Sequence, residues 1–192
     1  MSMDAQNVVV IGAGTMGNGI AHVFAQSGHT VTLVDVNAAA LERATETIGR
    51  NLDRLVAKAR ITAQIKADTL DRLTTSTEMH GAVSNADLVV EAATERVDLK
   101  LQIFEQLDKA APAHAILATN TSSISITKIA AVTQRASQVI GMHFMNPVPI
   151  MKLVEVIRGY DTSDETTSKV VALSSQLGKT PVEVNDYPGF VA

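Results

Sequence analysis

The chain has 192 residues, and with 46% hydrophobic and 19% charged residues it holds enough apolar material for a sizeable core and shows no signature of disorder. Its net charge of −4 at pH 7 favours neither nucleic acid nor an anionic membrane, and an aromatic content of 3% without tryptophan argues against base stacking. The absence of cysteine excludes disulfides, thiol nucleophiles and cysteine-based metal sites.

The sequence shows no targeting segment. Residues 1–4 lack the basic and apolar regions of a signal peptide, and no run approaches the roughly 20 apolar residues of a membrane span. We therefore expect a soluble, cytoplasmic protein with neither nucleic-acid nor membrane partners. Its length fits one large domain, or one domain and a small additional piece.

Short apolar runs alternate with segments of helical periodicity along the chain. Strands are predicted at 8–11, 30–34, 87–91, 115–119, 138–142, 153–157 and 182–184. Helices are predicted at 16–26, 41–59, 64–73, 97–107 and 164–177, with a turn-rich link at 74–85. Gly28 and Gly178 end two of the helices, and Thr162 with Glu165 fits a capping box for the last one.

This alternation predicts the fold class. It is typical of an α/β protein with a Rossmann-like, doubly wound, mainly parallel sheet. The helical residues at about 38–73 form a hairpin insertion after the second strand, and residues 1–192 are expected to make one dinucleotide-binding domain.

The first strand is followed by a G-x-G-x-x-G motif, Gly12-Ala13-Gly14-Thr15-Met16-Gly17, which opens the first helix. In this context the first glycine permits the tight turn, the second admits a pyrophosphate to the backbone, and the third lets helix pack on strand. The helix dipole and the N–H groups of the first turn then face the anion. The motif therefore predicts dinucleotide binding at residues 12–17.

Asp35 ends the second predicted strand, 18 residues after Gly17. A carboxylate at this place can accept a hydrogen bond from the ribose 2′-hydroxyl of NAD. The neighbours Val36 and Asn37 are not basic, as a 2′-phosphate would require, so the pattern favours NAD over NADP. An acid that only terminates the strand is the alternative.

Residues 141–155 place a histidine on one apolar strand and a carboxylate on the next, with Pro147 and Pro149 breaking the chain between them. If the strands pair, Glu155 reaches the imidazole of His143. A carboxylate in that position fixes the tautomer and stabilises the imidazolium, which makes a general base at neutral pH. The pattern equally fits a core histidine beside an unrelated acid.

Basic residues recur on the long second helix. Arg50, Arg54 and Lys58 follow one another every four residues, with Arg60 and Lys66 close behind. From the sequence alone a solvated helix face is the favoured explanation of this stripe, and an anion-binding surface is the alternative.

These motifs together resemble the L-3-hydroxyacyl-CoA dehydrogenase family, most closely its bacterial short-chain members, which act on 3-hydroxybutyryl-CoA. The resemblance spans essentially the whole chain, in order. The matching segments are 12–21, Glu91-Ala92-Ala93-Thr94-Glu95, Asn120-Thr121-Ser122-Ser123, 141–157, Leu177-Gly178-Lys179 and Pro188-Gly189-Phe190.

The resemblance implies an NAD-dependent oxidation of (S)-3-hydroxyacyl-CoA to 3-oxoacyl-CoA, and the reverse, without metal. His143 would be the acid/base, Glu155 would orient it, and Ser122 would bind the substrate. Lys58 and Arg54 would hold the phosphates of coenzyme A. The implied cofactor-binding residues are Gly12, Gly14, Thr15, Met16, Gly17, Asp35, Glu95, Lys100, Asn120 and Asn146. For Ser122, a helix N-cap is the alternative and is compatible with substrate binding.

The chain departs from the family pattern in two respects. Met145 stands where the family usually carries a second aromatic residue, and a methionine fills such a slot flexibly. The family also continues past Pro188-Gly189-Phe190 into a mostly helical domain that closes the acyl pocket and forms a homodimer. We therefore expect this chain to be the NAD-binding domain alone, as a truncated fragment that could be inactive.

Two other interpretations are open. One is a non-catalytic NAD-binding or structural relative, as the lens crystallins that resemble this family illustrate. The other is a 3-hydroxyisobutyrate- or 6-phosphogluconate-type dehydrogenase, which shares the glycine opening but uses a catalytic lysine and lacks the histidine–proline–glutamate segment.

Overall fold

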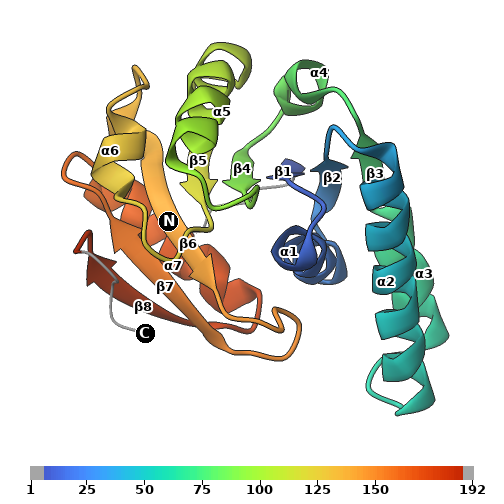
Figure 1. The fold of residues 1–192 in the computed structure, drawn as a ribbon. Helices are drawn as coiled ribbons and strands as arrows, with labels where there is room; N and C mark the ends of the chain where they lie inside the picture. The colour runs from blue at the N-terminus through green and yellow to red at the C-terminus, as the bar shows by residue number, and fades with distance from the viewer. Residues whose placement is uncertain (1–6, 188–192) are drawn as a thin grey trace.

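The computed structural model describes residues 7–187, so Pro188-Gly189-Phe190 lies outside it. In the described part, eight strands form one sheet in the order β3-β2-β1-β4-β5-β6-β7-β8 (Figure 1). The strands are β1 (Asn7–Ile11), β2 (Thr30–Val34), β3 (Leu73–Ser76), β4 (Leu88–Glu91), β5 (Ile116–Thr119), β6 (Val139–Phe144), β7 (Leu153–Arg158) and β8 (Thr180–Asn185). The α-helices are α1 (Thr15–Gln26), α2 (Ala38–Ala57), α3 (Ala63–Asp71), α4 (Met79–Val83), α5 (Val97–Ala110), α6 (Ile126–Ala130) and α7 (Asp164–Gln176).

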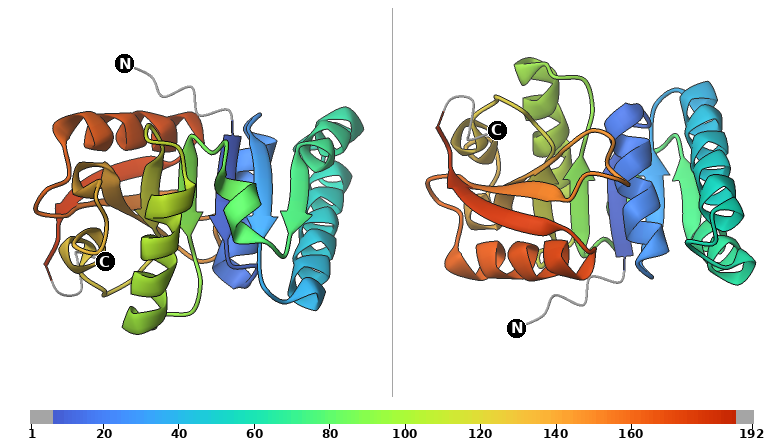
Figure 2. Two further views of the ribbon diagram at one scale, coloured as in Figure 1. Left: turned by 90° about the horizontal axis from the view of Figure 1, so that it is seen from above. Right: turned by 90° about the horizontal axis from the view of Figure 1, so that it is seen from below.

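Helices cover both faces of the sheet, as the two views of Figure 2 show. Successive strand residues point to opposite faces, so Val8 and Val10 pack with α1, α2 and α7, whereas Val9 and Ile11 pack with α4, α5 and α6. This double burial explains why the central strands are apolar throughout rather than alternating. The predicted doubly wound, mainly parallel sheet is confirmed.

The strand order reverses between β1 and β4. From β1 the chain moves outward through β2 to β3, and then returns to place β4 on the other side of β1. In open α/β sheets the ligand crevice lies outside the carboxyl ends of the strands at such a point. The loops after β1 and β4 therefore position the site.

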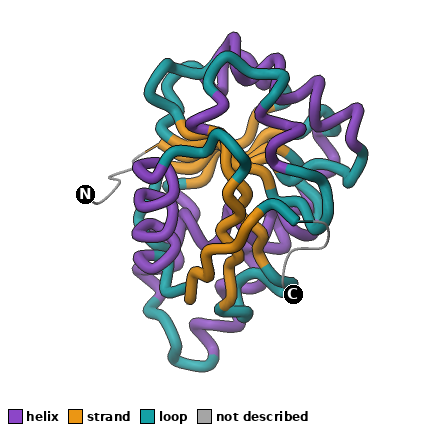
Figure 3. Tube along the Cα trace, turned by 90° about the vertical axis from the view of Figure 1, so that its left-hand side faces the viewer, coloured by secondary structure: helices purple, strands orange, loops and turns teal. Residues whose placement is uncertain are grey.

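The last two strands, β7 and β8, run opposite to the other six. β6 pairs with β7 in antiparallel register, with His143 opposite Glu155, and β8 then runs parallel to β7. Figure 3 shows the strands between helical layers in a view turned from that of Figure 1. The antiparallel pair is what brings two residues 12 positions apart in the sequence to one place.

The prediction for residues 64–85 is partly wrong. The third helix ends at Asp71, and the supposed turn-rich link contains the edge strand β3 and the short helix α4. Thr74 and Thr75 of β3 are exposed, so the strand lacks the apolar face from which it could have been predicted. Its backbone pairing with β2 makes it a strand. Helices α2 and α3 therefore form the crossover between β2 and β3, at the outer edge of the sheet in Figure 1.

The predicted cap of α7 is displaced by one residue. Ser163 is the N-cap and accepts from the backbone N–H of Thr166, whereas the buried Thr162 hydroxyl donates to the carbonyl of Val139. The last strand is longer than predicted and contains Pro181, which an edge strand tolerates. None of the helices within residues 7–187 is long and apolar enough to cross a membrane.

Candidate active site

The glycine turn after β1 is closely packed. Gly12 has a φ of +100°, and a Cβ there would lie 2.7 Å from the carbonyl oxygen of Ala92 in the β4–α5 loop. A Cβ on Gly17 would lie 1.7 Å from the carbonyl oxygen of Gly12. Both positions therefore require glycine, one for its backbone conformation and both for the close approach of neighbouring backbone.

Gly14, by contrast, borders open space. It is the N-cap of α1, and a Cβ on it would meet nothing within 4 Å. The cap is not closed by any side-chain hydrogen bond, and the first turn of α1 holds no acidic residue. The N–H groups of this turn, which includes Thr15 and Met16, therefore remain accessible to an anionic group, as a dinucleotide pyrophosphate requires.

Asp35 lies directly against this turn. Its Oδ2 accepts from the backbone N–H of Ala13 at 2.8 Å, and its Oδ1 accepts from that of Asn37 at 2.9 Å. A carboxylate has about four acceptor positions, so these bonds fix Asp35 at the turn and leave capacity for a hydroxyl group. Val36 beside it is 92% exposed, which places this corner at the surface.

His143 and Glu155 face each other across β6 and β7. The imidazole Nδ1 and the Glu155 Oε2 lie 2.8 Å apart, with 14% of the histidine side chain and 2% of the glutamate side chain exposed. Because a carboxylate can only accept, Nδ1 carries the hydrogen, and Nε2 is the basic nitrogen of the neutral ring. The arrangement can hold and release a proton at Nε2.

Helix α1 joins the glycine turn to the loop that follows His143. A Cβ on Gly19 would lie 2.8 Å from the Cβ of Val148, so helix and loop are in close contact. The rings of Phe24 on α1 and Phe144 on β6 also meet edge to face, with centroids 6.5 Å apart. Gly19 has no predicted role, although a further glycine two residues after the G-x-G-x-x-G motif was a signal for this contact.

A buried ion pair lies at the carboxyl end of β4. The Lys100 ammonium donates to both carboxylate oxygens of Glu91, at 2.8 and 2.9 Å, and neither side chain is exposed. Glu91 also accepts from the Thr119 hydroxyl and from the backbone N–H of Ala93. Lys100, predicted to bind the cofactor, is thus enclosed within the protein, and its predicted contact would have to be made through neighbours.

Glu95 connects the β4–α5 loop to the β5–α6 loop. Its carboxylate accepts from the Thr121 hydroxyl and from the backbone N–H of Ser122, and lies 3.5 Å from the Lys100 ammonium. Partial burial raises the pKa of Glu95, but Thr121, Lys100 and Ser122 together outweigh burial and hold the pKa below its ordinary value. Glu95 is therefore ionised at neutral pH.

Ser122 is exposed in the β5–α6 loop and is not a helix cap. Helix α6 is capped by Ser125, whose hydroxyl accepts from the backbone N–H of Lys128, so the N-cap alternative for Ser122 is wrong. The Ser125 hydroxyl donates to Asp186, whose carboxylate also accepts from the N–H groups of Ile126 and Thr127.

Asp186→Ala is expected to destabilise the protein by about 1 kcal/mol at neutral pH, as loss of a helix cap does. Partial burial raises the pKa of Asp186, but hydrogen bonds from Thr127, Ser125 and Ile126 together lower it by a larger amount. The pKa of Asp186 in the folded protein therefore lies below its value in the unfolded chain. The contribution is therefore complete above the unfolded pKa of about 3.9 and is lost as pH falls through the folded value.

Urea denaturation at several pH values measures this difference. The exposed Asp161, changed to alanine, is the matched control and should alter stability little. A difference between wild type and Asp186→Ala that persists unchanged well below about pH 3.9 would contradict the assignment.

The two predicted asparagines differ in their surroundings. Asn120 is 9% exposed, and its Oδ1 accepts from the backbone N–H of Phe144 at 2.9 Å. Asn146 is exposed at the start of the β6–β7 loop, next to the cis peptide bond that joins it to Pro147. Within residues 7–187 there is no cluster of three or more histidine, aspartate or glutamate side chains placed to hold a metal ion.

A cavity of about 650 Å³, here called the basic cavity, lies between α1, the carboxyl end of α2 and the β6–β7 loop. Its lining contains no acidic residue. Its basic residues are Arg54, Lys58, Arg60, Lys152 and Lys179. Only part of the predicted basic stripe therefore lines the cavity. Arg50 lies outside it and pairs with Glu46, and Lys66 pairs with Asp53.

Lys179 and His22 form part of this cavity wall. The Lys179 ammonium donates to the carbonyls of Val148 and Met151, which fixes the β6–β7 loop. Burial lowers the pKa of His22, and the positive charge of the nearby Lys179 lowers it as well. A hydrogen bond with Gln26 raises the pKa but does not cancel the shift. His22 is therefore neutral at pH 7 and adds no charge to the wall.

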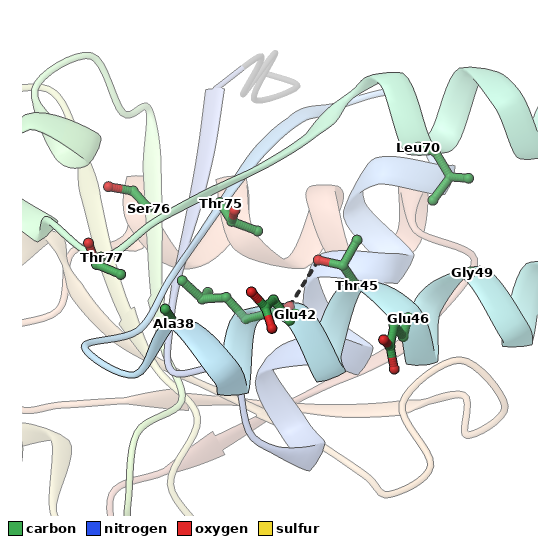
Figure 4. Close-up of a pocket in the computed structure, with 10 residues that line it drawn as sticks. Ala38, Glu42, Thr45, Glu46, Gly49, Leu70, Thr75, Ser76 and Thr77 are labelled. Atoms are coloured by element: carbon green, nitrogen blue, oxygen red, sulfur yellow. Dashed lines mark hydrogen bonds between the residues drawn. The ribbon is translucent and has the colours of Figure 1, made fainter.

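A second cavity, of about 720 Å³, lies on the other side of α2 and holds no predicted site residue. Figure 4 shows residues that line it, among them Glu42, Thr45 and Glu46 of α2 and the segment from Thr75 to Thr77. The Thr45 hydroxyl donates to the carbonyl of Leu41. The lining of this second cavity carries carboxylates, so it differs in charge from the basic cavity.

The sequence of this chain is similar to those of known dehydrogenases. Residues 7–187 match the family described as 3-hydroxyacyl-CoA dehydrogenase, NAD binding domain. A probable 3-hydroxybutyryl-CoA dehydrogenase of Bacillus subtilis is 48% identical over 190 residues, which are 99% of this chain and 66% of that protein. A 3-hydroxyadipyl-CoA dehydrogenase of Escherichia coli is 46% identical over 100% of this chain and 40% of its own length.

A solved structure agrees with these relatives. The crystal structure of (S)-3-hydroxybutyryl-CoA dehydrogenase from Ralstonia eutropha superposes with a TM-score of 0.95 at 50% identity, and the match covers 98% of this chain and 66% of that one. The chain thus spans about two thirds, or less, of the proteins it resembles. The fold, the glycine turn and the family match agree, so the chain belongs to the 3-hydroxyacyl-CoA dehydrogenase family and corresponds to its NAD-binding domain.

Proposed function

We propose that the protein binds NAD and takes part in the NAD-dependent interconversion of (S)-3-hydroxyacyl-CoA and 3-oxoacyl-CoA. The observation that carries the proposal is the 2.8 Å contact between His143 and Glu155 on neighbouring strands. A buried carboxylate that holds one imidazole nitrogen leaves the other as a proton acceptor, which oxidation of a hydroxyl group requires.

Residues around the glycine turn fit a dinucleotide. In this proposal the N–H groups at the start of α1 hold the pyrophosphate and Asp35 accepts from a ribose hydroxyl. The set is completed by Gly12, Gly14, Thr15, Met16, Gly17, Glu95, Lys100, Asn120 and Asn146. NAD, when bound, supplies the hydride acceptor.

In this proposal, residues of the protein transfer the proton of the substrate hydroxyl. His143 Nε2 takes the proton of the substrate hydroxyl, and Glu155, which accepts from Nδ1, stabilises the resulting imidazolium. Ser122 donates a hydrogen bond to the substrate from the β5–α6 loop, where Glu95 fixes its backbone. In the reverse direction the imidazolium returns the proton to the oxygen.

The basic cavity suits the phosphates of coenzyme A, with Lys58 and Arg54 as its contributors from α2. Five cationic side chains without a lining acid attract a polyphosphate. The loop that follows β6, the strand of His143, forms one wall of this cavity.

Charge reversal at Lys58 tests this assignment. Lys58→Glu is expected to raise KM for acyl-CoA about tenfold, because a lost attraction and a new repulsion of about 0.7 kcal/mol each at an exposed site together amount to about 1.4 kcal/mol. An acyl-pantetheine substrate, which lacks the nucleotide, should be unaffected. Arg50→Glu, on the same helix but outside the cavity, is the control. Equal losses for both substrates would refute the phosphate contact.

The Bacillus subtilis and Ralstonia eutropha proteins are named for 3-hydroxybutyryl-CoA, which supports a short acyl chain and makes this compound the first substrate to test. A cytoplasmic location and a homodimer formed through a further helical domain are also part of the proposal. They rest on the family resemblance and on the cysteine-free composition.

The decisive experiment is NADH oxidation with acetoacetyl-CoA, followed by absorbance, on this chain and on a longer form that includes the additional length of the relatives. The proposal expects NADH binding by both forms and turnover by the longer form. NADH binding without turnover in either form would favour the non-catalytic or structural alternative. Absence of NADH binding would refute the proposal as a whole.

A further inference from the structure

The end of β6 that carries His143 extends beyond its neighbour in the parallel sheet. Backbone pairing between β5 and β6 runs from Leu117 opposite Val139 to Thr119 opposite Gly141, and stops there. β6 continues to Phe144, and over these last residues its backbone pairs with β7. Because β7 carries Glu155, the two residues of the acid/base pair belong to one hairpin.

The side chain of Asn120 continues the interrupted pairing. Its Oδ1 accepts from the backbone N–H of Phe144 at 2.9 Å, where a further residue of β5 would have offered a carbonyl. The backbone N–H of Asn120 donates at 2.7 Å to the carbonyl of Glu91, at the end of β4. Asn120 therefore links the end of β6 to β4, whose following loop packs on the glycine turn.

This bond is buried. Phe144 is 1% exposed and Asn120 is 9% exposed, so water cannot replace the amide oxygen without rearrangement. Loss of the acceptor would leave a buried N–H group unpaired. The hairpin could then shift as a unit, because the contact between His143 and Glu155 is internal to it.

We propose that Asn120 is a positioning residue that holds the His143–Glu155 hairpin in register with the parallel part of the sheet, through its side-chain oxygen. The inference rests on the proposed function only for its effect on turnover. A displacement of about 1 Å at the reacting groups is enough to lower a rate about 100-fold. The amide nitrogen has no part in this role, which separates it from a cofactor contact.

Two substitutions distinguish the oxygen from the nitrogen. Asn120→Asp keeps an acceptor at the same position and removes the amide nitrogen, whereas Asn120→Leu has a similar size and removes both. Asn185→Leu, at the exposed end of β8, is the control for the change of residue type. Asn120→Ala is judged by the same criteria if the leucine variant does not fold.

The first measurement is hydrogen exchange of the Phe144 amide by NMR, with Ile140 of the same strand as internal reference. We expect exchange at Phe144 to be at least about tenfold faster relative to Ile140 in Asn120→Leu, as loss of one hydrogen bond implies, and nearly unchanged in Asn120→Asp. Unchanged exchange at Phe144 in the leucine variant would overturn the positioning role, whatever the activity of the protein.

The second measurement is turnover of the longer form with NADH and acetoacetyl-CoA. We expect kcat to fall about 10- to 100-fold in Asn120→Leu and most of kcat to return in Asn120→Asp, whatever the amide group contributes to the Kd for NADH. Equal losses in both variants with weaker NADH binding would overturn the role in favour of a cofactor contact. If the unaltered protein lacks turnover, the proposed function fails, and the exchange at Phe144 still decides whether Asn120 holds β6.

Discussion

His143→Gln is expected to lower kcat for acetoacetyl-CoA reduction by about 10²- to 10⁴-fold, the usual contribution of a general acid or base. Glutamine is close in size to histidine and can keep a hydrogen bond to Glu155, but it cannot take up or release a proton near neutral pH. The Kd for NADH should remain close to that of the unaltered protein, because the glycine turn and Asp35 lie on other strands. Steady-state kinetics of the longer form, with NADH fluorescence titration, measure both quantities.

His114→Gln is the matched control for this experiment. The His114 imidazole is largely exposed and contacts Asp87, which precedes β4 at the amino ends of the parallel strands, away from the site at their carboxyl ends. The same change of residue type there should leave kcat unaltered. Retained turnover in His143→Gln would refute the acid/base role. Loss of NADH binding in that variant would instead indicate that the substitution disturbs the cofactor site.

Lys100→Met is expected to destabilise the protein by about 3–5 kcal/mol, because it leaves the Glu91 carboxylate buried without its cation. Methionine fills nearly the same volume, so the effect reports charge rather than packing. The Thr119 hydroxyl and the Ala93 N–H still bind Glu91 but do not neutralise it. Urea denaturation gives the change in the free energy of unfolding.

The double variant Glu91→Gln with Lys100→Met should recover much of the lost stability, since neutral groups of similar size often replace a buried ion pair at little cost. Lys109→Met, exposed on the same helix, should change stability by no more than about 0.5 kcal/mol. A loss below about 1 kcal/mol in Lys100→Met would contradict the prediction that the buried Glu91 carboxylate depends on Lys100 for its stability.

Much of the fold is predictable because its elements carry strong local signals. The apolar run of β1, the glycine turn and the stripe of α2 are each set by residues close in sequence. β3 was missed because its four residues, Leu73–Ser76, have neither an apolar run nor alternation, and only pairing with β2 makes them a strand. Such an edge strand is stabilised by its backbone partner and not by its side chains.

The candidate site was predictable in its residues but less so in their surroundings. His143 and Glu155 were expected to meet if their strands paired, and they lie within hydrogen-bonding distance. The full burial of Lys100, and the hydrogen bond of the Asn120 oxygen to β6, were not foreseen. A lysine on the apolar stripe of α5, between Val97 and Phe104, was the available signal for a buried partner.

Most strands and helices, the glycine turn and the titratable residues can be predicted from the sequence, because these depend on short-range periodicity and residue chemistry. The tertiary structure alone decided which of these residues meet. Sheet order brings the β4–α5 loop onto Gly12, antiparallel pairing joins His143 to Glu155, and burial separates Lys100 from the surface. Such contacts depend on the packing of segments far apart in the sequence, which local patterns do not encode.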